Sequence, residues 1–143
     1  MRDISSEDIP ILEAARRASS AAYCPYSKFP VGAVVETEQG TFSGCNIENA
    51  SFGLTVCAER VAILTAIAAG ARTLLRLSVS CPTAQESDFL AGRMPCGACR
   101  QVIAEFMPQG AEIIVDGGGV WRVDELLPQA FQLNRNRAGS ADA

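Results

Sequence analysis

Residues 56–81 read VCAERVAILTAIAAGARTLLRLSVSC, an apolar segment of helical length followed directly by an alternating one. From Val56 or Cys57 to Ala69 apolar side chains fall on nearly every side of a helix, which Gly70 would end, so we expect a buried helix. Leu75 to Cys81 then alternates in the way that strands do. This order of elements is typical of α/β proteins.

Working outward from this stretch, further strands and helices alternate along the chain. On its N-terminal side we expect a helix, capped by Ser5 or Ser6, and then two strands joined around residues 38–40: 8–22, 31–36 and 41–46. On its C-terminal side we expect a helix from Cys96 or Cys99 to Met107, then two strands and a short helix: 113–115, 120–123 and 124–127. The pattern predicts a three-layer α/β/α sandwich whose helices cover a central mixed sheet of about five strands.

Length and composition indicate one domain. The chain has 143 residues, of which 48% are hydrophobic, enough for one sizeable core and too few for a second. Repeats and linkers are not evident. We therefore expect a single domain over residues 1–134, followed by a polar C-terminal tail over residues 135–143.

The charge balance bears on possible partners. Twelve Lys and Arg against sixteen Asp and Glu give a net charge of −4, and no block of positive charge suits a nucleic acid. The first ten residues are acidic and polar, unlike a signal peptide, and the longest apolar stretch, 61–69, is too short to cross a bilayer. We expect a cytoplasmic protein that binds a small, roughly neutral ligand rather than nucleic acid or membrane.

Two cysteine motifs carry the candidate chemistry, Cys57-x-Glu59 and Cys96-x-x-Cys99. Each lies where a loop enters a predicted helix, and a helix N-terminus favours the thiolate form that binds zinc. If the two helix ends meet, three sulfurs can hold one zinc ion and leave a fourth position for water, as catalytic sites do. The chain contains no histidine, which excludes histidine ligands and a histidine general base.

Other interpretations of these cysteines are open. A CxxC pair alone also fits a redox pair or half of a structural zinc site, and Cys57 alone fits a buried core cysteine. A structural zinc or redox domain would close a four-cysteine site with Cys45 or Cys81 and have no use for Glu59. A non-catalytic binding module is another alternative. The combination of both motifs at helix starts favours catalytic zinc, with Cys24, Cys45 and Cys81 as structural thiols.

Four segments in order carry a resemblance to a known family: AYCPYSKFPVGA (22–33), GCNIENASFGLTVCAER (44–60), PCGACRQ (95–101) and ELLP (125–128). Together they resemble the small, homotetrameric, zinc-dependent cytidine deaminases of the cytidine/deoxycytidylate deaminase superfamily. The resemblance extends from about residue 14 to residue 131 without a missing element.

The resemblance implies a hydrolase of pyrimidine salvage that holds one zinc ion per subunit. It would deaminate cytidine and 2'-deoxycytidine to uridine and 2'-deoxyuridine, releasing ammonia after zinc-bound hydroxide attacks C4. Cys57, Cys96 and Cys99 would be the zinc ligands. Glu59 would take the water proton, pass it to N3 and later protonate the leaving amino group. A related deaminase of nucleosides such as blasticidin S, of free bases or of polynucleotides is the alternative.

Arg60 is a candidate for tuning the metal. Three thiolates and one Zn²⁺ sum to −1, which makes a poor Lewis acid, and the two helix N-termini offset part of that charge. Arg60 lies three residues after Cys57, on the same helix face, so we expect it to donate hydrogen bonds to ligand sulfur; the resemblance implies the same. The alternative is a surface arginine that pairs with nearby acids.

Asn46 and Glu48 are candidates for sugar binding. Both close a predicted strand on one face, where an amide and a carboxylate can together bind a pair of hydroxyl groups. The resemblance assigns them to the ribose. A carboxylate at this position would repel a phosphorylated sugar, which favours a nucleoside over a nucleotide.

The resemblance implies further substrate contacts, which it divides between subunits. Within one subunit, Phe29 would pack on the pyrimidine and Ala58 would contact the substrate. In a homotetramer with shared active sites, three residues would approach a neighbour's nucleoside: Ala50, Phe52 and Phe131. Phe52 stands where many relatives carry tyrosine, so one possible hydrogen bond is lost while the packing of the ring is kept.

Overall fold

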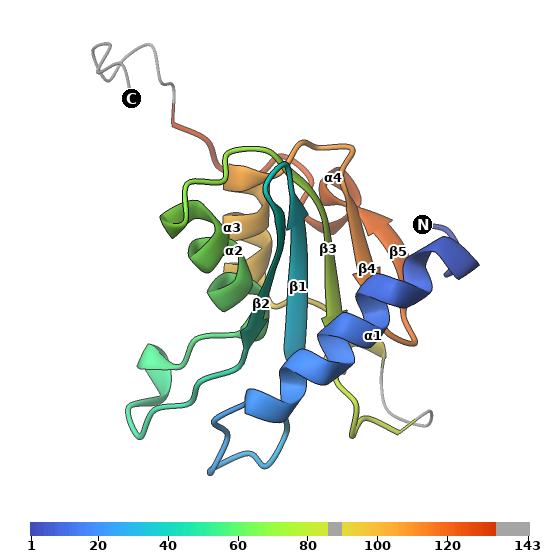
Figure 1. Ribbon diagram of the computed structural model, residues 1–143. Coiled ribbons are helices and arrows are strands. Elements are labelled where there is room, and N and C mark those ends of the chain that lie inside the picture. Colours follow the sequence, from blue (N-terminus) through green and yellow to red (C-terminus); the bar gives the residue numbers. More distant parts are fainter. Residues whose placement is uncertain (86–89, 134–143) are drawn as a thin grey trace.

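The computed structural model describes residues 1–85 and 90–133, in which helices and strands alternate as expected (Figure 1). The helices are α1 (Ile9–Ala18), α2 (Ala58–Ala68), α3 (Gly97–Phe106) and α4 (Val123–Leu126). The strands are β1 (Gly32–Thr37), β2 (Gly40–Cys45), β3 (Leu74–Ser80), β4 (Glu112–Val115) and β5 (Gly119–Arg122). The predicted tail, 135–143, lies outside the described residues, as does part of the polar loop 82–93.

The five strands form one mixed sheet in the order β2-β1-β3-β4-β5. Only β3 and β4 run parallel among these strands, and α3 lies in the connection between them; every other neighbouring pair is antiparallel. The mixed five-stranded sheet confirms the predicted architecture.

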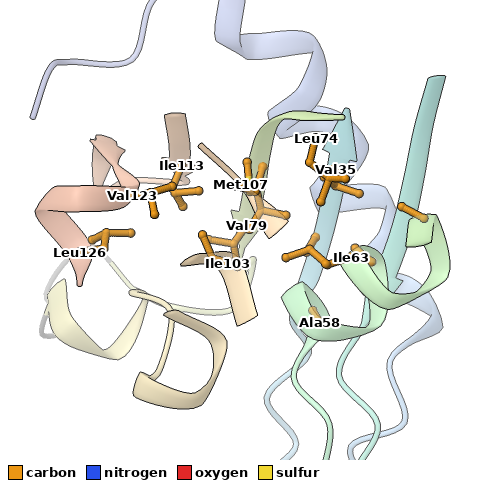
Figure 2. Close-up of a cluster of buried hydrophobic side chains, with 14 of the residues drawn as sticks. Val35, Ala58, Ile63, Leu74, Val79, Ile103, Met107, Ile113, Val123 and Leu126 are labelled. Atoms are coloured by element: carbon orange, nitrogen blue, oxygen red, sulfur yellow. The ribbon is translucent and has the colours of Figure 1, made fainter. Parts of the chain in front are cut away.

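The sheet separates two hydrophobic clusters and so makes a three-layer sandwich. Figure 1 shows α1 crossing one face of the sheet, with α2 and α3 on the other. Strand alternation supplies both clusters, because Val34 packs with Leu12 on the α1 side while Val35 joins Ile63 and Ile103 on the opposite side. Figure 2 shows the second cluster, where side chains of α2 and α3 meet those of the sheet.

The prediction that α2 is buried all round is wrong in part. Ala58, Ala62, Ile63 and Ala66 form its fully buried inner face, but Leu64 on the opposite side is 48% exposed. The reason is that α2 lies in an outer layer, so a single chain covers one of its faces only. The apolar outer face is left to solvent in the isolated chain.

Gly44 fixes how closely α2 approaches the sheet. A Cβ atom built at Gly44 would overlap the backbone of Ala58 and Ala62. The absent side chain and the two alanines therefore let the helix backbone lie directly on β2. This contact sets the position of the first turn of α2, which carries the candidate site residues.

A charged network ties the N-terminal segment to the sheet. The Asp8 carboxylate is fully buried and accepts two hydrogen bonds from the Arg2 guanidinium, at 2.7 and 3.1 Å. Arg2 also bonds Glu112 in β4, and its backbone pairs with Val120 in β5. These bonds hold the pKa of Asp8 well below its usual range.

Several boundaries differ from the predictions by a few residues. The first helix ends at Ala18 and continues as a 3₁₀ turn, Ser19–Ala21, and the polar loop before the second cysteine motif holds another, Leu90–Gly92. Within the described residues, no helix is both long and apolar enough to cross a bilayer.

Candidate active site

The N-terminal ends of α2 and α3 converge on the candidate metal centre. Cys57 is the residue before α2, Cys96 is the residue before α3, and Cys99 lies in the first turn of α3. The Sγ atoms of Cys57 and Cys96 are 3.8 Å apart, and those of Cys96 and Cys99 are 3.5 Å apart. The structure thus brings together the three sulfurs that the sequence predicted.

The spacing of these sulfurs fits a zinc ion. Tetrahedral zinc with Zn–S bonds of about 2.3 Å places sulfurs about 3.8 Å from each other. The three Sγ atoms all lie within 4.8 Å of one another. In the part of the chain that the structure describes, neither Cys45 nor Cys81 joins this group, which argues against a closed four-cysteine site.

Hydrogen bonds among the thiols and Arg60 favour a thiolate at Cys57. They lower the pKa of Cys57 to about 5, the bond with the Cys99 thiol having the largest effect and the one with Arg60 adding to it. Arg60 Nη2 lies 3.6 Å from Cys57 Sγ and also donates to the Thr55 carbonyl at 3.3 Å. Arg60 therefore faces the sulfur cluster, as predicted, and not a surface acid.

Glu59 lies beside the sulfurs at the wall of a cavity. It is only 5% exposed, and burial, reinforced by the negative charge of Cys57, raises the pKa of its carboxyl to about 7. A carboxyl group with such a pKa both accepts and releases a proton near neutral pH, as a general acid–base group requires.

The cavity next to the sulfurs has a volume of about 260 Å³. Of the residues predicted from the sequence, it is lined by Phe29, Asn46, Glu48, Cys57, Ala58, Glu59 and Cys96. The lining that the sequence analysis missed is Ser27, Val31, Thr55, Val79, Cys81, Gly92, Arg93 and Met94. The sequence gives a weak indication of two of these lining residues, because Met94 lies just before the second cysteine motif and Cys81 directly follows β3. It gives no indication that Gly92 and Arg93 line the cavity.

Asn46 and Glu48 are held in place at the cavity by backbone contacts. Asn46 Oδ1 accepts from the Val31 amide and Asn46 Nδ2 donates to the Phe29 carbonyl, both at 2.8 Å. Glu48 Oε1 accepts from the amides of Tyr26 and Ser27 at 3.0 and 3.1 Å. Although desolvation opposes the shift, hydrogen bonds from Ser27 and Tyr26 hold the pKa of Glu48 below its ordinary value, so this wall of the cavity is anionic.

Three predicted contacts lie away from this cavity. Over the described residues, its lining does not include Ala50, Phe52 or Phe131. The ring of Phe52 is 73% exposed and meets Tyr26 edge-on, and Phe131 is 69% exposed, with its carbonyl bonded to Gln101 Nε2 at 3.0 Å. Neither aromatic residue therefore lines the cavity of its own chain.

Comparison with known proteins places the chain in a family. Residues 5–115 match the model of the cytidine and deoxycytidylate deaminase zinc-binding region, a range that contains both cysteine motifs. The chain belongs to the cytidine and deoxycytidylate deaminase family. Members of this family bind zinc, and the three sulfurs described above are the group that fits it.

Named relatives within the family cover nearly the whole chain. It is 46% identical over 126 residues to the cytidine deaminase of Sporosarcina psychrophila, covering 85% of this chain and 88% of that protein. The crystal structure of cytidine deaminase from Burkholderia pseudomallei superposes with a TM-score of 0.73 at 39% identity, covering 90% and 100%. The blasticidin-S deaminase of Bacillus cereus is 30% identical over 137 residues, covering 92% and 97%.

Proposed function

We propose that the chain is a zinc-dependent hydrolase that converts cytidine and 2'-deoxycytidine to the corresponding uridines and ammonia. The observation that carries this proposal is the buried Glu59 carboxyl, which lines a cavity of about 260 Å³ beside three clustered sulfurs. The cytidine deaminases among its relatives support the substrate class.

Cys57, Cys96 and Cys99 would hold the zinc ion as thiolates. When bound, zinc supplies the Lewis acidity that makes water nucleophilic near neutral pH. Arg60 donates to Cys57 Sγ at 3.6 Å and so draws negative charge away from the ligand set. The N-termini of two helices act in the same direction.

Glu59 would move the protons. It accepts one proton from the attacking water and delivers it to N3 of the pyrimidine, which reduces the negative charge that develops in the ring. It then carries the second water proton to the amino group on C4, so that the C–N bond breaks and ammonia leaves. The net change is one water consumed and one ammonia released.

The nucleoside would be oriented by the other residues of the cavity. Asn46 and Glu48 bind the ribose hydroxyl groups, Phe29 packs on the pyrimidine, and Ala58 contacts the base from the first turn of α2. The anionic Glu48 carboxylate disfavours a 5'-phosphate, so a nucleoside is preferred to a nucleotide.

A homotetramer with shared active sites would complete this proposal. Support comes from apolar side chains that the isolated chain leaves exposed: Phe52, Leu54, Leu64, Phe131 and Leu133. Ala50, Phe52 and Phe131 would approach the nucleoside of a neighbouring subunit. Thiolate zinc ligands suit a reducing compartment, which supports a role in cytoplasmic pyrimidine salvage.

Glu59→Ala tests the catalytic proposal against a structural zinc site. The proposal expects a variant that keeps one zinc ion per chain and has lost turnover, since Glu59 is not a ligand. Wild-type turnover in the variant would contradict it. Because the blasticidin-S deaminase of Bacillus cereus is 30% identical, blasticidin S is the second substrate to assay. Faster turnover of blasticidin S than of cytidine would make the chain a blasticidin-S deaminase instead.

A further inference from the structure

One wall of the cavity comes from outside the recognised motifs. Gly92, Arg93 and Met94 line it, and they belong to the connection between β3 and α3. We call residues 90–94 the wall segment. Its own backbone is bonded locally, because the Arg93 amide donates to the Leu90 carbonyl at 2.9 Å and the Met94 amide to the Ala91 carbonyl at 3.4 Å.

The wall segment rests on the turn between β4 and β5. Arg93 Nη1 lies over Gly117, so close that a Cβ atom at position 117 would overlap it. A Cβ atom at Gly118 would lie 3.1 Å from Leu90 Cδ1 and 2.6 Å from Val115 Cγ1. Leu90 and Arg93 of the wall segment therefore occupy space that two adjacent glycines leave free.

The Arg93 guanidinium links the turn between β4 and β5 to the connection between β3 and α3. Nη2 donates to the Gln85 carbonyl while Nη1 contacts Gly117. The guanidinium thus contacts the turn, while the same residue lines the cavity. This arrangement lets Arg93 hold the neighbouring Gly92 and Met94 in place at the cavity.

We propose that the Gly117–Gly118 turn supports the wall segment and fixes its position, and we call this turn the seat. Arg93 and Gly117 are then positioning residues for nucleoside binding. The inference rests on the proposed deaminase function. Because the sulfurs and Glu59 belong to the N-terminal ends of α2 and α3, loss of the seat changes the shape of the cavity and leaves the metal in place. The effect therefore falls on KM more than on kcat or zinc content.

A pair of matched variants tests the seat, Gly117→Ala and Gly119→Ala. Both glycines have positive φ, +71° and +85°, so both variants carry the same kind of backbone strain. Only the new methyl group at position 117 meets Arg93; that at position 119 would lie 3.2 Å from Arg2 O and Met1 Sδ, at the other end of the turn. Gly117→Ala is expected to raise KM for cytidine about tenfold, and Gly119→Ala to leave it unchanged, since misplaced positioning groups cost this much or more.

Arg93→Ala supplies a second variant that keeps the turn intact. It is expected to raise KM by a similar factor, and the double variant Arg93→Ala/Gly117→Ala to be no worse than Arg93→Ala, because the overlap is then removed. Additive losses in the double variant, or equal rises in KM for Gly117→Ala and Gly119→Ala, would overturn the proposal.

Amide hydrogen exchange of residues 90–94 measures how firmly the wall segment is held, independently of enzyme activity. Exchange is expected to quicken in Gly117→Ala and Arg93→Ala and to stay at the wild-type rate in Gly119→Ala. Unchanged exchange in both of the first two variants would contradict the seat. Failure of the deaminase proposal would appear separately, as absence of cytidine turnover by the zinc-loaded wild-type protein.

Discussion

Arg60 Nη2 lies 3.6 Å from Cys57 Sγ, so a permanent cation faces the thiolate just before α2. The same nitrogen bonds the Thr55 carbonyl, which holds the guanidinium against the preceding loop. A group that bonds a metal ligand commonly changes metal affinity or activity by about 10- to 100-fold when it is removed.

Arg60→Gln is therefore expected to lower kcat by about tenfold or more, because the sulfurs regain the charge that Arg60 withdraws. The pH profile of kcat should shift upward, since a less acidic metal activates water at higher pH. Steady-state kinetics across pH measure both effects. Arg17→Gln on the exposed side of α1 removes the same charge and should change neither; an unaltered profile in Arg60→Gln would refute the assigned role.

Glu48 predicts discrimination against phosphorylated substrates. Wild-type kcat/KM for dCMP should lie about a hundredfold below that for deoxycytidine, because like charges placed together cost several kcal/mol. Glu48→Gln should reduce the ratio of kcat/KM for deoxycytidine to kcat/KM for dCMP, mainly because its kcat/KM for deoxycytidine falls. Comparable turnover of both substrates by the wild-type protein would remove the argument for a nucleoside enzyme.

Gly44 predicts that the seating of α2 is sensitive to one methyl group. Gly44→Ala would force the backbone of Ala58 and Ala62 away from β2, with a loss of about 1–3 kcal/mol in the free energy of unfolding. Zinc affinity should fall as well, since Cys57 begins this helix. Ser43→Ala, at the neighbouring exposed position, is the control for both denaturation and zinc titration.

The ion pair between the buried Asp8 and Arg2 should make the free energy of unfolding fall in acid. Its folded pKa is lowered by Arg2, so its contribution is complete above the unfolded value near 3.9 and is lost as pH falls below about 4. Asp8→Asn should reduce the free energy of unfolding at pH 7 by about 2 kcal/mol. The loss is smaller than for a fully buried ion pair, because solvent reaches the Arg2 side chain and weakens the attraction. The difference from wild type should shrink in acid, and Asp3→Asn, at an exposed position of the same segment, is the control in denaturation experiments across pH.

The sequence predicted the metal group because its chemistry is local. Cys96 and Cys99 share one helical turn, and Cys57 and Glu59 open another, so spacing alone placed them at helix starts. Asn46 and Glu48 both line the cavity, but not as the last residues of a strand, because β2 ends at Cys45 and both residues follow it. Only the meeting of the two helix ends required the fold.

Features that depend on distant segments were not predictable. The wall segment reaches the cavity because of Gly117 and Gly118, which follow it by more than twenty residues and carry no signal of contact. The exposed side of α2 was misjudged because uniform apolarity cannot distinguish a core helix from one with an uncovered face. Phe131 is placed by the hydrogen bond of its carbonyl to Gln101, which no pattern in the sequence indicates.

The fall in ultraviolet absorbance when cytidine becomes uridine tests the central claim most directly. Zinc-loaded protein is expected to produce the fall and one ammonia per cytidine, to lose this activity on chelation, and to regain it when zinc is restored. No turnover by the zinc-loaded protein, or an undiminished rate after the zinc has been removed, would contradict the account.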